Sequence, residues 1–366
     1  MAKFSEVLTI VNGRNQKQVV CDDGKYPIYG SGGIMGYAND YICKAETVVI
    51  GRKGSINKPI FVETPFWNVD TAFGLCANSE KLNPKYLYYF CEKFDFEKLN
   101  TTVTIPSLTK SNLLNVEIPL PNLEKQKQIV ELLDKITSLI SLRKQQLAKL
   151  DELVKARFVE MFGDPADNVN NLPASPMTAI CQIIDGDRGK NYPKQEEFSD
   201  SGFCLFLNAK NVTAQGFSFE NCTYITEEKD ALLRNGKLCR GDVVLTTRGT
   251  IGNLAFYDTS VPYENIRINS GMVILRMNKQ VVSEIFFIEQ FKMQLDSIKS
   301  RIASGSAQPQ LPISTMNKIE MILPPIELQN QFAAFVERVS QQKQTVQQRL
   351  EKLELMKKAL MQEYFG

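Results

Sequence analysis

The side chains of this sequence that could do chemistry are basic and amide groups in short loops that also contain glycine and serine. Arginine and lysine bind phosphates and guanine edges, asparagine and glutamine bind adenine edges, and glycine lets a backbone approach closely. In residues 1–120 the candidates for nucleic-acid contact are Arg14, Lys17, Ser31, Arg52, Lys53, Asn57 and Lys58. In residues 177–323 they are Arg188, Lys190, Tyr192, Lys194, Asn208, Lys210, Arg248, Arg301, Ser304, Ser306 and Gln308. Taken singly, each of these is more often an ordinary surface residue.

Lys53 and Arg248 occupy equivalent positions in the two halves of the chain, as do Ser55 and Thr250. Residues that recognise two different DNA sequences should differ between the two halves. Residues that recur in both halves are therefore also compatible with a shared feature of the fold. Both interpretations stay open at this point.

Catalytic chemistry is missing from the sequence. The chain has no histidine, which excludes Ser–His and Cys–His nucleophile pairs and zinc sites that use histidine. Its eight cysteines form no C-x-x-C pair, so we interpret them as small buried hydrophobic residues in a reducing compartment. No phosphate-binding glycine motif is present, and the carboxylates form no cluster typical of metal ligands. The sequence therefore predicts a binding protein with no catalytic residues, no metal and no cofactor.

Length and charge bound the architecture. A chain of 366 residues predicts two or three domains, and 43 basic against 41 acidic residues leave a net charge of +2. Any nucleic-acid surface must therefore come from local basic patches. We find no signal peptide and no apolar run long enough to span a membrane, and we predict a cytoplasmic protein without membrane contact.

A long internal repeat organises the chain. Residues 121–163 align without a gap to residues 324–366 at a constant offset of 203, so that Gln126 pairs with Gln329. Apolar residues recur at steps of three and four, beginning with Ile129, Leu132 and Ile136, which predicts a long helix with a coiled-coil seam in each copy. Neither helix can bury its seam alone, so we expect the two helices to pair.

The remaining segments predict two similar globular heads of mixed α/β class. The first head covers residues 1–120, a Pro/Asn/Asp-rich linker covers 164–176, and the second head covers 177–323. A buried strand and basic glycine turn at 46–56 recurs at 241–252, and a helix at 84–100 recurs at 282–302. The order is head, long helix, linker, head, long helix.

These features together resemble a known family. They are the Pro-x-x-Glu-x-Gln pattern that opens each long helix (residues 118–126 and 322–329), the valine-rich strand that ends in Lys/Arg-Gly-Ser/Thr-Ile, the closing Phe-Gly of each copy, and the duplication itself. The chain resembles the specificity subunit of a type I restriction–modification system over its whole length. Its start close to Phe4 and its end at Gly366 suggest a compact variant.

The resemblance implies that each head is a target-recognition domain that reads one half of a split double-stranded DNA site. It implies that the helices pair as an antiparallel coiled coil with pseudo-twofold symmetry and set the unread gap. It further implies docking of two adenine-N6 methyltransferase subunits, which bind S-adenosylmethionine, and of restriction endonuclease/translocase subunits. The chain itself would be non-catalytic and hold no cofactor.

Two other classes of function stay open from the residues alone. One is a two-headed coiled-coil scaffold or adaptor without DNA-modifying partners, and the other is an orphan DNA-binding regulator of the same fold. A restriction enzyme combined in one chain is excluded, because the sequence has no methyltransferase or nuclease motif.

Overall fold

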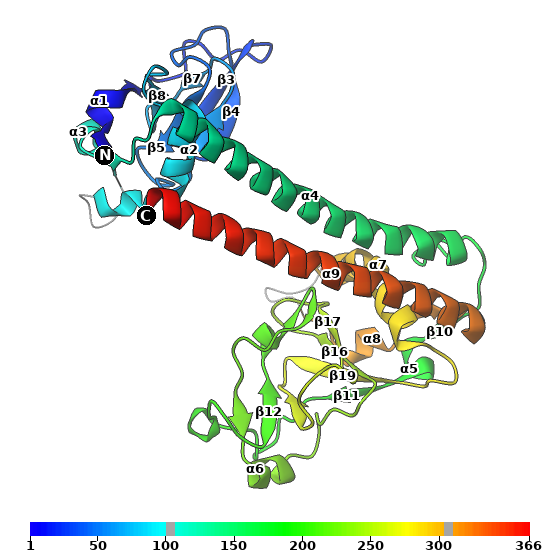
Figure 1. The fold of residues 1–366 in the computed structure, drawn as a ribbon. Helices are drawn as coiled ribbons and strands as arrows, with labels where there is room; N and C mark the ends of the chain where they lie inside the picture. Colours follow the sequence, from blue (N-terminus) through cyan, green and yellow to red (C-terminus); the bar gives the residue numbers. More distant parts are fainter. Residues whose placement is uncertain (100–106, 304–309) are drawn as a thin grey trace. The chain divides into compact units, whose positions relative to one another are not determined.

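The computed structural model describes residues 1–99, 107–303 and 310–366, and the chain forms two compact units (Figure 1). The first unit comprises residues 1–146 and 346–366, and the second comprises residues 147–345. Each unit thus combines one globular head with a part of each long helix.

The first head is built on a four-stranded antiparallel sheet. Its strands lie in the order β2 (Leu8–Asn12), β8 (Ala72–Ala77), β5 (Thr47–Gly51) and β6 (Ile60–Val62). Every residue of β5 is buried, which explains its run of valine and isoleucine, since a central strand covered on both faces needs no polar alternation.

Two smaller sheets complete this head. In one of them β3 (Tyr26–Gly30) pairs antiparallel with β4 (Gly33–Ala38) and parallel with β7 (Trp67–Asn68). In the other, β1 (Ala2–Lys3) pairs with β9 (Glu117–Ile118). The short helices α1 (Phe4–Val7) and α3 (Lys110–Leu114) lie near the ends of the head in sequence.

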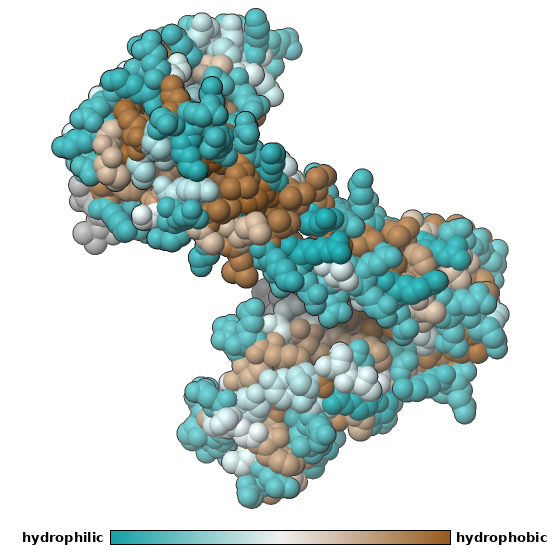
Figure 2. Space-filling model, in the orientation of Figure 1, coloured by the Kyte–Doolittle hydropathy of each residue, from teal (hydrophilic) through white to brown (hydrophobic). Residues whose placement is uncertain are grey.

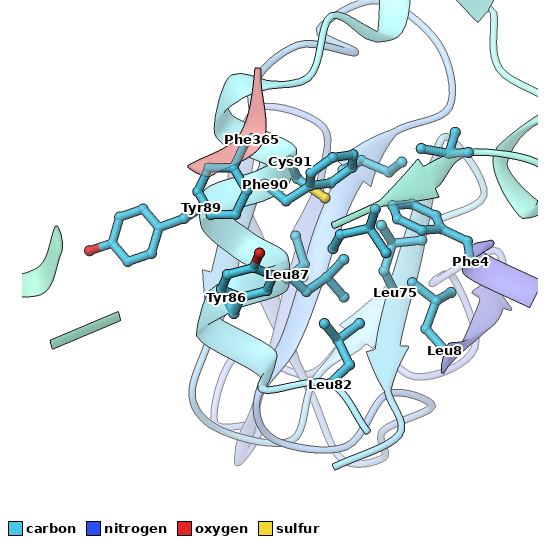
Figure 3. Packing of buried hydrophobic residues seen from close by; sticks show 14 of the residues in the cluster. Phe4, Leu8, Leu75, Leu82, Tyr86, Leu87, Tyr89, Phe90, Cys91 and Phe365 are labelled. Carbon is cyan, nitrogen blue, oxygen red and sulfur yellow. The ribbon is translucent and has the colours of Figure 1, made fainter. Parts of the chain in front are cut away.

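Helix α2 (Pro84–Lys93) packs its apolar face on the four-stranded sheet. Figure 3 shows Leu87 and Phe90 of this helix pointing toward Leu75 of β8. The ring of Phe365 packs against that of Tyr86, with centroids 4.9 Å apart. Asn83 caps the helix by accepting from the backbone N–H groups of Lys85 and Tyr86 at 2.9 and 3.1 Å.

This helix is shorter than the predicted 84–100, and a side chain from a distant loop binds the segment that follows it. The amide oxygen of Asn57 accepts from the backbone N–H of Phe96 at 2.7 Å, and its nitrogen donates to Asp95 at 2.9 Å. After Lys93 the chain leaves the helix and forms the 3₁₀ turn η1 (Phe96–Leu99).

The second head repeats the strand order of the first. Its four-stranded sheet runs β11 (Cys181–Asp185), β19 (Met272–Met277), β16 (Asp242–Thr246) and β17 (Leu254–Phe256). Its three-stranded sheet runs β15 (Tyr224–Ile225), β12 (Cys204–Leu207) and β18 (Ile266–Ile268), again with one antiparallel and one parallel pair. The helices that correspond to α1, α2 and α3 are α5 (Met177–Ile180), α7 (Glu284–Ala303) and α8 (Ile313–Met316).

The second head also contains additional elements. They are η2 (Gln195–Glu197), η3 (Ala209–Asn211), the pair β13 (Val212–Thr213) and β14 (Gly216–Phe217), and helix α6 (Glu227–Leu232). The end of the predicted linker is ordered too, since β10 (Ala174–Pro176) pairs with β20 (Glu320–Ile322) as β1 pairs with β9. A strand with proline is tolerated there because it lies at an edge.

The two long helices are α4 (Leu123–Phe162) and α9 (Ile326–Phe365), and they pair antiparallel within each unit. In the first unit Lys144 forms an ion pair with Glu354 at 2.9 Å, and the end of α9 packs against the start of α4. In the second unit Phe158 packs edge-on against Phe332, with ring centroids 5.3 Å apart. The predicted fold class is confirmed.

The buried seam of α4 differs in one step from the predicted one. Leu133 is fully buried, whereas the predicted seam residue Leu132 is 38% exposed. The buried residues are Ile129, then Leu133 four positions later, then Ile136 three positions later. The predicted order was three and then four, and both orders fit the period of a helix.

As a result, α4 keeps an uncovered apolar stripe in the first unit. Leu132, Leu139 and Leu142 are 38%, 41% and 57% exposed. Figure 2 shows hydrophobic side chains gathered along this part of the helix on the face drawn. Within the described ranges, no helix is both long and apolar enough to cross a membrane.

The cysteines follow the prediction only in part. All are free, and Cys43, Cys91, Cys181 and Cys204 are buried, where burial raises the pKa of the Cys181 thiol to about 12. Cys239, however, is exposed.

Candidate nucleic-acid interface

Each long helix is fixed to its own head by one fully buried glutamine. The side chain of Gln126 donates to the carbonyls of Lys81 and Pro121 at 3.0 and 2.8 Å, and accepts from the N–H of Asn83 at 2.8 Å. This explains the glutamine of the motif that opens the helix. Its three hydrogen bonds join the helix start to the cap of α2.

Gln329 repeats this arrangement in the second unit. It donates to the carbonyls of Val281 and Pro324 at 3.1 and 2.8 Å, and accepts from the N–H of Ser283 at 3.0 Å. Three equivalent hydrogen bonds therefore join the head to the start of its long helix in each unit.

In the first head, two basic loops lie against the turn that precedes β8. The backbone N–H of Arg14 donates to the carbonyl of Asn68 at 2.8 Å, and the indole N–H of Trp67 donates to the carbonyl of Arg14 at 3.0 Å. From the other side, the N–H groups of Arg52 and Lys53 donate to the carbonyl of Thr71 at 2.8 and 3.4 Å. The side chains of Arg14, Arg52 and Lys53 are exposed.

In the second head, the turn that precedes β19 also holds two basic loops, the first through a side chain and the second through backbone N–H groups. Arg188 donates to the carboxylate of Asp185 at 3.0 Å and to the carbonyl of Ser270 at 3.3 Å. The N–H groups of Thr247 and Arg248 donate to the carbonyl of Gly271 at 2.9 and 3.2 Å.

A glycine makes the close approach of the first loop possible in each head. A Cβ on Gly13 would lie 1.7 Å from the carbonyl oxygen of Val69, and a Cβ on Gly186 would lie 2.3 Å from that of Asn269. Any other residue would push the loop away from the turn.

Arg188 and Arg248 line one cavity of about 340 Å³. Its walls also include Asp185, Thr247 and Gln310. Two guanidinium groups and an amide around one hollow can bind phosphate oxygens or base edges, while the Thr247 hydroxyl already donates to the carbonyl of Gly271 at 3.0 Å.

The recurrence of Lys53 and Arg248 has a structural cause in their backbones. Lys53 bridges to Ser107, and Arg248 bridges to Gln310 in the corresponding place. The adjacent N–H of Leu108 donates to Arg52, and that of Leu311 donates to Thr247, both at 2.9 Å. The backbone position is thus a feature of the fold, while both side chains stay exposed.

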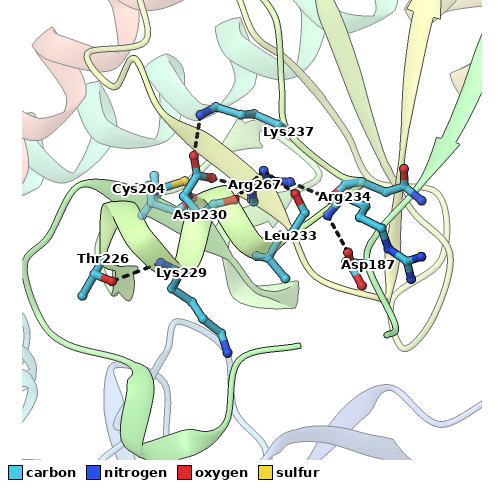
Figure 4. Close-up of polar contacts among 11 residues, drawn as sticks. Asp187, Cys204, Thr226, Lys229, Asp230, Leu233, Arg234, Lys237 and Arg267 are labelled. Atoms are coloured by element: carbon cyan, nitrogen blue, oxygen red, sulfur yellow. Dashed lines mark hydrogen bonds and ion pairs between the residues drawn. The ribbon is translucent and has the colours of Figure 1, made fainter. Parts of the chain in front are cut away.

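A buried carboxylate shapes the Arg188 loop. Asp187 is 6% exposed and accepts from the N–H of Gly189 at 2.7 Å and of Arg234 at 2.8 Å (Figure 4). The hydrogen bond from Gly189 and then those from the 234–235 backbone hold the pKa of this carboxyl below its usual range, against the effect of burial. The loop that carries Arg188 and Lys190 is therefore tied to the loop after α6.

A buried ion pair holds α6 itself. Asp230 accepts from the Arg267 guanidinium and from Lys237, the latter at 2.5 Å. Arg267 also donates to the carbonyls of Asn235 and Leu233 at 2.7 and 3.0 Å. Burial alone would raise the pKa of Asp230, but the hydrogen bonds from Lys237 and Arg267 lower it on balance.

Other predicted contact residues of the first head have varied positions. Ser31 lies in the turn between β3 and β4, where its Cβ approaches Gly51 next to Arg52. Asn57 uses both ends of its amide inside the head, as described above. Lys17 and Lys58 are exposed.

In the second head, Tyr192 packs edge-on against Phe206 at 5.8 Å, and Asn208 caps η3 by accepting from the N–H of Lys210. Lys190, Lys194 and Lys210 are exposed. The structure does not bring these five residues into the lining of the arginine cavity. The side chain of Arg301, and Ser304, Ser306 and Gln308, lie outside the described residues.

The prediction missed residues that only the fold brings to these loops. Asp185, Thr247 and Gln310 line the cavity, and Gln310 was detectable as a second amide beside Gln308. In the described part of the chain, no cluster of three or more His, Cys, Asp or Glu side chains could hold a metal ion.

Comparison with known proteins identifies the family. The sequence model described as Type I restriction modification DNA specificity domain matches residues 1–152 and 177–355. The chain belongs to this family. The predicted resemblance to type I specificity subunits is confirmed, and the two matched ranges reflect the internal duplication.

Individual relatives agree with this assignment. The chain is 24% identical over 340 residues to the type I restriction enzyme MjaVIII specificity subunit of Methanocaldococcus jannaschii, covering 87% of this chain and 75% of the relative. It is 21% identical over 325 residues to the EcoBI specificity subunit of Escherichia coli, covering 80% and 66%.

A solved structure shows the same fold. The type I restriction–modification S subunit from M. genitalium aligns with a TM-score of 0.62 at 18% identity, over 100% of this chain and 95% of that chain.

Proposed function

We propose that this type I specificity subunit reads a split double-stranded DNA site, with each head reading one half and the long helices setting the unread gap. The observation that carries this proposal is the repeated geometry of the basic loops. In both heads two such loops are held against one turn, by Asn68 and Thr71 in the first and by Ser270 and Gly271 in the second.

The proposed contacts divide into two kinds. Exposed Arg14, Lys53, Arg188 and Arg248 would attract phosphates, and the segments between them would reach base edges. With a net charge of only +2, the chain alone should bind DNA weakly, and its affinity should fall steeply with salt.

Partner subunits belong to the same proposal. Two adenine-N6 methyltransferase subunits would dock on the helices, and the exposed stripe of Leu132, Leu139 and Leu142 supports such a contact. They would bring S-adenosylmethionine, and restriction endonuclease/translocase subunits would join them. The chain would act in the cytoplasm, and it would contribute recognition without catalysis or a cofactor of its own.

The test is selection from a random-sequence duplex DNA library by the chain co-purified with a type I adenine methyltransferase subunit. We expect enrichment of two short words at one fixed gap. Replacing residues 177–323 by the second head of another specificity subunit should change one word only. An intact complex that enriches no sequence would contradict the proposal and favour a scaffold without DNA recognition.

A further inference from the structure

The β3–β4 hairpin of the first head exposes large apolar side chains. Ile34, Met35 and Tyr37 are 55%, 63% and 46% exposed, all within one short strand. Clusters of this kind on a protein surface mark binding sites. The corresponding strand of the second head, β15, has no such surface, because Ile225 is fully buried and Tyr224 is half-buried.

A β-bulge explains why two neighbouring side chains are exposed together. Tyr29 pairs with Ile34, but Ile28 pairs with Gly36, so Met35 is an additional residue without a partner opposite. In a regular strand Ile34 and Met35 would point to opposite faces. The bulge breaks this alternation, and bulges often aim side chains at functional sites.

The end of this hairpin lies between the two basic loops. Ser31 of its turn approaches Gly51, which directly precedes Arg52 and Lys53. On the other side, Val69 packs beside Gly30 of the hairpin and approaches Gly13, which precedes Arg14. An apolar tip flanked by cations on both sides complements a polyanion with an apolar feature inside its groove.

We propose that the β3–β4 hairpin enters the major groove of the first half-site, where Ile34 and Met35 contact the C5-methyl groups of thymine. This inference rests on the proposed function. A two-stranded ribbon fits the major groove, and the thymine methyl is the apolar group that base edges present there. Arg14, Arg52 and Lys53 then face the phosphates on either side. The first word therefore contains thymine that is recognised by its methyl group.

Deoxyuridine tests this directly, because it lacks only the methyl group of thymine. In the duplex enriched by selection, each thymine of both strands is replaced in turn by deoxyuridine, and binding by the methyltransferase complex is measured. We expect about fourfold weaker binding at one or two positions of the first word, the loss expected for one buried methyl. Positions in the second word should respond less.

The double variant Ile34→Ala/Met35→Ala should bind the thymine and deoxyuridine duplexes equally. Both side chains are exposed, so the variant should fold, which the fluorescence of Trp67 in the same head can verify. The control is Leu232→Ala, an equally exposed apolar residue (55%) of the second head, which should keep the discrimination.

Two results would overturn the hairpin proposal and leave the proposed function standing. One is a selected first word whose thymines can all be replaced without loss, and the other is a double variant that still discriminates. Failure to enrich any two-part site would overturn both proposals together.

Discussion

The two heads share the same order of strands in their main sheets. They differ in the segment between β3 and β5 of the first head and between β12 and β16 of the second. In the first head the chain turns directly from β3 into β4 and exposes the apolar hairpin. In the second head it leaves β12 through η3, β13 and β14 before it returns as β15, and then adds α6. The strands that pair parallel with β3 and β12 also differ. In the first head this strand is β7, which carries Trp67, and in the second it is β18, which carries the buried Arg267.

The comparison separates the contacts that hold the basic loops in both heads from the segments that differ between the heads. The glutamine anchors, the glycine approaches and the backbone bridges of Lys53 and Arg248 occur in both heads. The hairpin occurs in the first, and the Asp230–Arg267 ion pair in the second. We infer that the shared frame presents phosphate-binding groups at fixed places, while the variable segment decides which bases are read.

The largest expected effect is specific to the second head. Asp230→Ala leaves the guanidinium of Arg267 buried without its carboxylate, which should destabilise this unit by about 3–5 kcal/mol. Urea unfolding followed by circular dichroism should then show an early transition. Trp67, the only tryptophan, reports the first head and should keep its midpoint.

The matched control for this change is Lys237→Met. The side chain of Lys237 is 42% exposed, so its loss should cost less than about 1 kcal/mol. Equal effects of the two variants would show that the ion pair with Arg267 is not what holds α6.

The next effect should be equal in both units. Gln126→Leu and Gln329→Leu each leave buried backbone groups without partners, at a cost of about 2–4 kcal/mol. Only Gln126→Leu should shift the Trp67 fluorescence transition, whereas both should appear in circular dichroism. Gln128→Leu and Gln331→Leu, at exposed positions of the same helices, serve as controls and should change little.

A smaller effect concerns DNA binding. Lys53→Ala and Arg248→Ala should each weaken binding to the selected duplex by about 1 kcal/mol and flatten the salt dependence by about 0.9 in the log–log slope if each side chain contacts one phosphate. Affinities measured at several salt concentrations check this. Lys155→Ala, exposed on α4, should leave the slope unchanged. If neither loop variant changes affinity or folding, the interpretation of both turns is wrong.

The smallest effect is a pH dependence that should occur in the second unit. The pKa of Asp187 is lowered in the folded protein, so its stabilising effect is complete above the unfolded value of about 4 and is lost as the pH falls through the folded value. Asp187→Asn should therefore lower stability more at pH 7 than at a pH well below about 4, where the carboxyl of the parent protein becomes protonated. The corresponding loop of the first head, at Gly13 and Arg14, has no carboxylate. Unfolding curves of the variant and the parent protein at both pH values provide the measurement, and an equal difference at both would contradict the assignment.

The sequence by itself determined the duplication, the two long helices and the family. These features can be recognised from the sequence without knowledge of distant contacts. The repeat aligns without a gap at an offset of 203, and the helices follow from the three–four spacing of their apolar residues. The strand-and-turn units around Lys53 and Arg248 were also predictable, because a valine run followed by a glycine turn is a local pattern.

Only the tertiary structure decided which residues meet. Asn57, predicted as a contact residue, instead binds Asp95 and Phe96 in the segment after α2, and Leu133 replaces Leu132 in the buried seam. The cavity joins Arg188 to Arg248 and Gln310, which lie far apart in the chain. Contacts between distant loops depend on the order and register of the strands, which local propensity does not specify. The buried seam of a helix is open in the same way, because two sets of apolar residues fit the same helical period.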